Sequence, residues 1–187
     1  GPNLRRLLVG IFALFAILVV NSVYLVSIRI LGHATGESYE NWFFLNMFIA
    51  HLVLGLAIVL PIIVFGFFHI RNAHDRPNRR AVRAGFALFS TAIVLLITGI
   101  LLTRIEGIIV IRDEVARSVL WWLHVITPLG VMWLFVLHRL AGNRIRWKVG
   151  MAWAAVSAIF AVVMVVLQSQ DPRQWNVEGN PEGDKYF

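Results

Sequence analysis

The stretch NWFFLNMFIAHLVLGLAIVLPIIVFGFFHI, from Asn41 to Ile70, decides the fold of this chain. It is apolar almost throughout, and as a helix rising 1.5 Å per residue it is long enough to cross about 30 Å of hydrocarbon. A membrane-barrel strand would alternate apolar and polar residues, and this run does not alternate. We therefore expect a transmembrane helix, in which every backbone group finds its partner within the segment.

Four further apolar runs predict an all-α fold, a bundle of five membrane-spanning helices. The chain has 187 residues, 59% of them hydrophobic, and a mean hydropathy of +0.76, which is too apolar for a soluble domain of this size. We expect residues 1–168 to form one transmembrane domain and residues 169–187, with their prolines, glycines and mixed charge, to form an external linker or tail. The five expected helices cover Leu4–Leu31, Trp42–Ile70, Ala84–Thr103, Val119–Arg139 and Val149–Gln168.

The charge distribution predicts how the chain is oriented. Of its 17 basic residues, 11 lie at the N-terminus and in the loops after the second and fourth helices, together with a single acid, Asp75. By the positive-inside rule the N-terminus is cytoplasmic and the C-terminal tail periplasmic, in a bacterial cytoplasmic (inner) membrane. Because the basic residues sit in short loops, the net charge of +7 does not indicate a nucleic-acid partner. The chain contains no cysteine, which excludes disulfides and a c-type haem attachment site within it.

Four histidines lie inside the second and fourth expected helices, where ionisable residues are costly and usually functional. His51 and His69 are 18 residues apart, which is five helical turns, so they share one face. His124 and His138 are 14 residues apart, close to four turns, and also share a face. Both helices run from outside to inside. We therefore expect His51 to face His124 near the outer surface and His69 to face His138 near the inner surface.

Two facing imidazoles at one depth are the axial ligand set of a b-type haem, so the pattern predicts two haems. The two intervals differ, because 18 residues rise about 27 Å and 14 about 21 Å. A bend at Pro61 or Pro128, or a helix tilt, would bring the inner pair level. A non-haem metal chain, a proton relay and hydrogen-bonding histidines in a packed bundle are the alternatives. Zinc or copper would usually recruit carboxylates, thiolates or clustered imidazoles, and the two helices offer no carboxylate within their spans.

Small residues accompany the histidines along the chain. Gly55 lies one turn after His51, Gly66 one turn before His69, and Gly130 between the histidines of the fourth helix, while Thr98 and Gly99 sit in the middle of the third. They would either give a flat macrocycle clearance or allow close helix–helix packing.

These features resemble the haem-bearing half of the cytochrome b of bc-type complexes, which carries two histidines on each of two helices. In size and in the Thr98-Gly99 feature the chain also resembles the small cytochrome b subunits of formate dehydrogenases, thiosulfate reductases and nickel–iron hydrogenases. The resemblance covers residues 4–168 and implies a four-helix haem-binding core, two b haems and quinone chemistry. The chain departs from the first group in its interval of 18 residues, and from the second in having no histidine on its first helix.

Charged residues near the histidines suggest further roles. Arg71 and Arg139 are placed to pair with haem propionates, although the positive-inside bias alone would also explain them. Glu106, Asp113 and Glu114, between the third and fourth helices, could take up the protons that quinol oxidation releases. They could equally be solvated loop residues with local ion pairs.

The function expected from the sequence is electron transfer across the membrane through two bis-histidine b haems. It would link a quinone pool in the bilayer to an external redox partner, for example a periplasmic c-type cytochrome reached through the tail. The alternatives are a non-redox membrane anchor or receptor for an external domain, and a b561-like transmembrane reductase fed by a soluble donor.

Overall fold

The protein is a bundle of five α-helices. The computed structural model describes residues 2–73, 75–104, 107, 109–141 and 147–170. The helices are α1 (Pro2–Thr35), α2 (Trp42–Ala73), α3 (Arg79–Leu102), α4 (Glu114–Leu140) and α5 (Trp147–Ser169). Of the expected tail, residues 169–187, only Ser169 and Gln170 lie within the described part of the chain.

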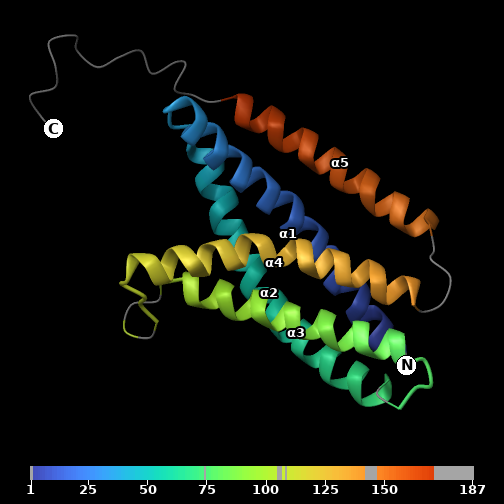
Figure 1. Cartoon of the computed structure of the whole chain (residues 1–187). Helices are drawn as coiled ribbons and strands as arrows, with labels where there is room; N and C mark the ends of the chain where they lie inside the picture. Colours follow the sequence, from blue (N-terminus) through green and yellow to red (C-terminus); the bar gives the residue numbers. More distant parts are fainter. Residues whose placement is uncertain (1, 74, 105–106, 108, 142–146, 171–187) are drawn as a thin grey trace, which may run out of the picture.

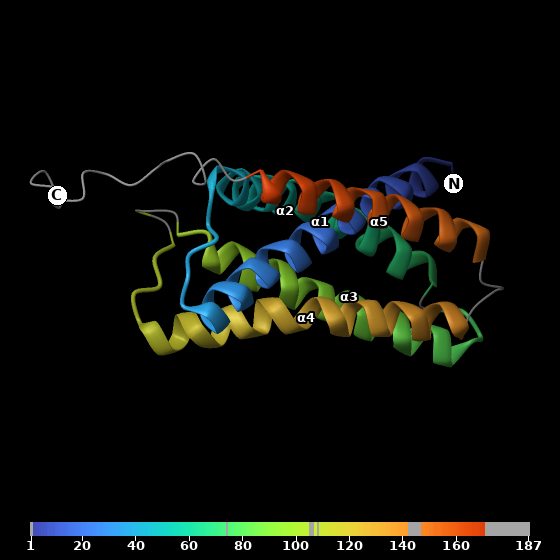
Figure 2. The same ribbon diagram turned by 90° about the horizontal axis from the view of Figure 1, so that it is seen from above.

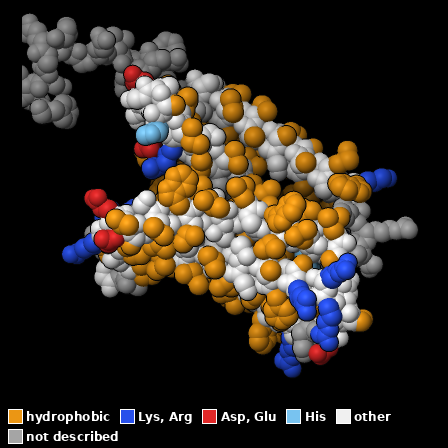
Figure 3. Space-filling view, in the orientation of Figure 1, with side chains coloured by type: hydrophobic (Ala, Val, Ile, Leu, Met, Phe, Trp, Pro, Cys, Tyr) orange, Lys and Arg blue, Asp and Glu red, His pale blue; other side chains and the backbone are white. Residues whose placement is uncertain are grey.

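All five helices are long and apolar enough to cross a membrane, which confirms the predicted helical bundle. Large hydrophobic side chains cover the flanks of the helices, whereas the charged side chains on the visible face gather toward the two ends of the bundle (Figure 3). An apolar belt between charged ends is the surface expected of a protein that has lipid as its solvent.

The helices form two layers. The first contains α1, α2 and α5, and the second is the antiparallel pair α3 and α4, which make the most extensive contact in the bundle. The layers meet mainly where α2 packs on α3, whereas the backbones of α2 and α4 hardly approach one another. Figures 1 and 2 show this arrangement, with α2 running at an inclination to α4.

The bundle has two ends, which we name by the chain. The tail end holds the connections α1–α2 and α3–α4 and the end of α5, and the N-terminal end holds the start of α1 and the other two connections (Figure 1). A hydrophobic cluster at the tail end joins α1, α2 and α5 through Tyr24, Ile28, Phe43, Phe44 and Met164. The Tyr24 hydroxyl donates to Gln168 Oε1 at 2.5 Å, and Gln168 Nε2 donates to the Tyr39 carbonyl at 3.0 Å. These bonds fix the end of α5 to α1.

Capping residues explain why α3 and α4 each begin five residues before the apolar runs that predicted them. Asn78 caps α3, its side-chain oxygen accepting from Ala81 N at 3.2 Å, and Asp113 caps α4 by accepting from Ala116 N at 2.7 Å. Such caps satisfy backbone donors that would otherwise be left free at a helix start. Asn78 Nδ2 also donates to the Ala141 carbonyl at 2.5 Å, so it ties the start of α3 to the end of α4.

Because Asn78 both caps α3 and holds the end of α4, Asn78→Ala is expected to lower the free energy of unfolding by about 1–2 kcal/mol. The measurement is denaturant unfolding of the detergent-solubilised protein. Asn46→Ala is the matched control, since Asn46, within the part of the chain that the structure describes, donates to the Trp42 carbonyl of its own helix. An equal loss in both variants would contradict the role given to Asn78.

Candidate metal centres: two facing histidine pairs

The structure brings the four membrane histidines together in the two pairs that their spacing predicts. The ring centroids of His51 and His124 lie 6.1 Å apart, with their planes at 89°. The centroids of His69 and His138 lie 6.2 Å apart, with their planes at 79°. The rings join α2 to α4, two helices whose backbones hardly meet. The first pair lies toward the tail end and the second toward the N-terminal end.

The unequal intervals of 18 and 14 residues do not prevent this pairing. Both α2 and α4 run without a break through their prolines, Pro61 and Pro128. Because α2 is inclined to α4 (Figure 1), the longer interval on α2 is shortened in projection along α4. An inclination between the two helices therefore accompanies the level pairing of the histidines.

The separation of the rings suits an ion held between two imidazoles. With ring bonds of about 1.33 Å a ring nitrogen lies about 1.1 Å from its ring centre, and a metal–imidazole bond is about 2.0–2.1 Å, so two rings across one ion have centroids about 6.3 Å apart. The observed values are 6.1 and 6.2 Å. Ordinary aromatic pairs also have centroids about 4.5–7 Å apart, so the hydrogen bonds of the rings must decide which nitrogen is available.

The hydrogen bond of His138 leaves its second nitrogen available. His138 Nδ1 lies 3.0 Å from the carbonyl oxygen of Ala81 on α3. A carbonyl can only accept, so Nδ1 must carry the proton, and Nε2 keeps a lone pair. A histidine whose other ring N–H donates to a backbone carbonyl is the usual arrangement of a metal ligand.

His124 has a similar partner on α3. Its Nδ1 lies 3.2 Å from the hydroxyl of Thr98, which is almost fully buried. That hydroxyl has its own acceptors in the carbonyls of Val94 at 2.9 Å and Leu95 at 3.0 Å. The Thr98 hydrogen is therefore used, and its oxygen accepts the Nδ1 hydrogen of His124. Here too Nε2 is the free nitrogen.

Two glycines of α3 make room for these rings. A Cβ added to Gly99 would lie 2.9 Å from Cε1 of His124, and one added to Gly85 would lie 3.1 Å from Cε1 of His138. The two glycines are 14 residues apart, the same interval as the two histidines, because α3 and α4 run antiparallel in constant register. Sequence reasoning singled out Gly99 and missed Gly85, and this shared interval is the signal that identifies it.

The two remaining histidines have different surroundings. His69 stacks on Phe65, with ring centroids 5.1 Å apart and planes at 14°. His51 Nδ1 is buried and has no hydrogen-bond partner within the described part of the chain, and the same holds for Oδ1 of Asn21 on α1. Asn21 Nδ2 donates to the Met47 carbonyl at 3.0 Å, one turn before His51. A helical side chain leans over the preceding turn, so the two unpartnered atoms, His51 Nδ1 and Asn21 Oδ1, lie near one level.

The other glycines named from the sequence have different environments. A Cβ at Gly66 would overlap the ring of Phe89, so Gly66 permits close packing of α2 on α3, as the helix-packing alternative expected. Gly130 has the Thr91 methyl at 3.7 Å from an added Cβ, an ordinary contact, and Gly55 has nothing within 4 Å.

The described charged candidates from the sequence lie at helix ends. Arg71 and Arg139 lie in the last turns of α2 and α4, close to His69 and His138 in sequence. Asp113 caps α4, and Glu114 lies in the first turn of that helix, where a negative charge is favoured by the helix dipole. Both thus have a structural role in addition to the proton handling that we expected of them. Glu106 lies outside the described residues.

Comparison of the chain with protein-family models, with curated proteins and with solved structures finds no match in any of the three. Within the residues that the structure describes, no three His, Cys, Asp or Glu side chains gather into one group. Two facing imidazoles could occupy opposite positions on an ion whose remaining positions are filled by a macrocycle.

Gly99→Ala is expected to displace the His124 ring and to lower the free energy of unfolding by about 1–2 kcal/mol through overpacking. Gly55→Ala is the matched control. It adds the same methyl group to open space in a membrane helix, and a gain of up to about 1 kcal/mol from helix propensity is expected. Denaturant unfolding in detergent measures both. A Gly99→Ala variant as stable as Gly55→Ala would show that the ring does not rest on Gly99.

Proposed function

We propose that the protein is a transmembrane electron carrier that holds two b-type haems, one between His51 and His124 and one between His69 and His138. The observation that supports it most is the pair of imidazole separations, 6.1 and 6.2 Å, which match the spacing of two ligands across one ion at both levels. The Nδ1 contacts of His124 and His138, which leave Nε2 free, support it independently.

The chain's own residues determine how such a site would behave. Haem iron, when bound, supplies reversible one-electron transfer. Ala81 and Thr98 orient the imidazoles of α4 through Nδ1, and Gly85 and Gly99 let those rings rest against α3. The four rings are partly buried between the apolar helices.

The depth of the two sites supports transfer across the membrane. Fourteen residues separate His124 from His138, so the two sites lie about 21 Å apart along α4, which is most of a hydrocarbon core of about 30 Å. A single histidine pair would serve one surface only. Two pairs, one near each end, connect the two surfaces.

We further propose the setting of this activity. The basic residues at the N-terminal end support a cytoplasmic location for that end and a periplasmic tail, in a bacterial inner membrane. The electron source or acceptor in the bilayer would be a quinone, with Glu114 and the other acids of the α3–α4 connection as the groups that handle protons. The tail would lead to an external redox partner such as a c-type cytochrome.

Pyridine haemochrome analysis of the purified protein is expected to give two haems per chain, one for each histidine pair. His124→Ala is expected to reduce this value to one, and so is His138→Ala, because each removes one axial ligand from a different site. The double variant should retain none.

His33→Ala is the control, since this exposed histidine lies in the last turn of α1, away from both pairs. It should keep two haems. A wild-type protein without a reducible b-type spectrum would overturn the proposed function. Loss of both haems in each single variant would contradict the independence of the two sites.

A further inference from the structure

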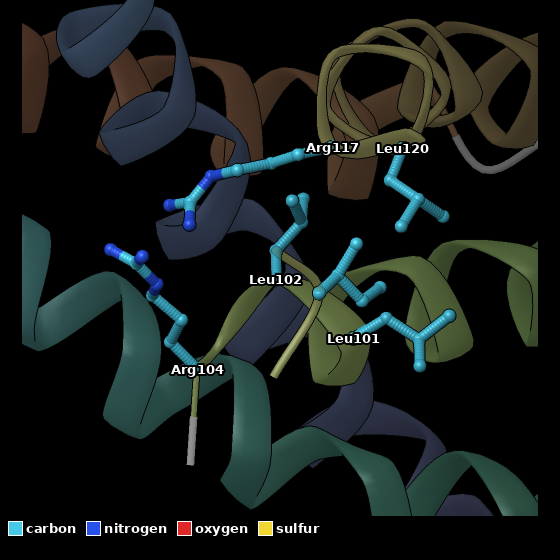
Figure 4. A pocket seen from close by; sticks show the side chains of 6 residues that line it. Leu101, Leu102, Arg104, Arg117 and Leu120 are labelled. Atoms are coloured by element: carbon cyan, nitrogen blue, oxygen red, sulfur yellow. The ribbon is translucent and has the colours of Figure 1, made fainter. Parts of the chain in front are cut away.

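Two arginines converge at the tail end of the bundle, away from the basic loops of the N-terminal end. Arg104 follows α3, and Arg117 lies in the first turns of α4. Both line one narrow hollow, too small to admit a water molecule, together with Leu101, Leu102, Ile111 and Leu120. Figure 4 shows their side chains extending in the same direction, with the guanidinium groups at one side of the hollow toward α1 and α2. The positive-inside rule does not explain arginines at this end.

The backbone at Arg104 adds a second observation. Its φ is +54°, and among the described residues it is the one non-glycine residue with a positive φ. It follows the C-cap Thr103, at the position where helices commonly end on a left-handed glycine. An L-residue is strained there, because its Cβ lies too close to the following carbonyl oxygen. A strained residue that keeps a long cationic side chain indicates a use for that side chain.

The third observation is the position of Arg117 relative to the histidines. It precedes His124 by seven residues, so it lies almost two full turns away on the same face of α4, about 10.5 Å along the axis. That face of α4 presents His124 to His51 of α2. Arg117 therefore lies on the tail-end side of the His51–His124 pair. It is on the face of α4 that is turned toward α2.

We infer that Arg104 and Arg117 form a carboxylate clamp that binds the propionates of the haem held by His51 and His124. Guanidinium groups bind carboxylates with paired, charge-assisted hydrogen bonds, and two of them match two propionates. The clamp rests on the proposed function and fixes the orientation of this haem, with its propionates toward the tail end. It also gives the two sites different electrostatic environments.

The test is a redox titration of the haem-loaded protein, in which each haem gives one reduction step. The step that is lost in His124→Ala belongs to the haem of the His51–His124 pair. In Arg117→Gln the midpoint potential of this haem is expected to fall while that of the other haem stays unchanged. Removal of a nearby cation destabilises the more negative, reduced form. Arg117→Lys keeps the charge but loses the paired geometry, so an intermediate shift is expected.

Arg104→Gly separates the clamp from a merely structural role. Glycine relieves the left-handed strain, so the apoprotein should become more resistant to unfolding, while the potential of the same haem falls. Arg29→Gln is the matched control, because Arg29 lies at the same end and pairs with Glu40 at 3.7 Å. Neither potential should move in it.

Unchanged potentials in Arg117→Gln and Arg104→Gly, with two haems retained, would overturn the clamp and leave the proposed function standing. So would equal shifts in the clamp variants and in Arg29→Gln. If only the amount of co-purified phosphatidylglycerol falls, the arginines bind a lipid headgroup and the clamp is likewise wrong. If the wild-type protein binds no haem, the proposed function itself is contradicted.

Discussion

The contact on which the rest of the site depends is the packing of two imidazoles against two glycines of α3. Gly99 and Gly85 are the places where α4 can bring His124 and His138 onto α3 without a clash. Once there, each ring directs Nδ1 to a partner on α3 and presents its other side to α2. The extensive contact between α3 and α4 holds this register, so the α3–α4 layer positions one member of each histidine pair.

The other members of the pairs, His51 and His69, belong to the layer of α1, α2 and α5. That layer meets α3 closely at Gly66 and Phe89, and it meets α4 at the histidine rings and where Phe12 of α1 packs edge-on against Phe135. The tail-end cluster and the hydrogen bonds of Gln168 join α1, α2 and α5 within that layer. Ligands on opposite layers mean that one ion at each level would connect the two halves of the bundle, so binding and folding would be coupled.

Much of this arrangement follows from the sequence, because membranes impose simple rules. Length and hydropathy predict the spans, and helical phase predicts which histidines share a face. The pairing of His51 with His124 and of His69 with His138 follows from phase and chain direction together, and the structure brings both pairs together. The helical phase of the histidines on α2 and α4 does not predict which residues of α3 they contact. Gly85 looks like any small residue of a membrane helix until the register of α3 against α4 places it under His138.

The roles of three other residues could not be predicted from the sequence for the same reason. Asp113 was expected to handle protons, but its cap of α4 depends on where that helix begins, five residues before the apolar run. Asn21 lies in α1, which carries neither member of a histidine pair, and its importance depends on the α1–α2 contact that brings it to the turn before His51. From the sequence, Gly66 could either make room for a macrocycle or allow two helices to pack closely. The position of Phe89 against Gly66 favours close packing.

The most direct test of the central claim is the low-temperature electron paramagnetic resonance spectrum of the oxidised, purified protein. Two imidazoles per iron at each level, with ring planes at 89° and 79°, predict two low-spin ferric signals of the strongly anisotropic kind that nearly perpendicular axial imidazoles produce. A high-spin signal, which indicates an open axial position, would contradict the pairing of α2 with α4 histidines, and so would a spectrum without ferric haem.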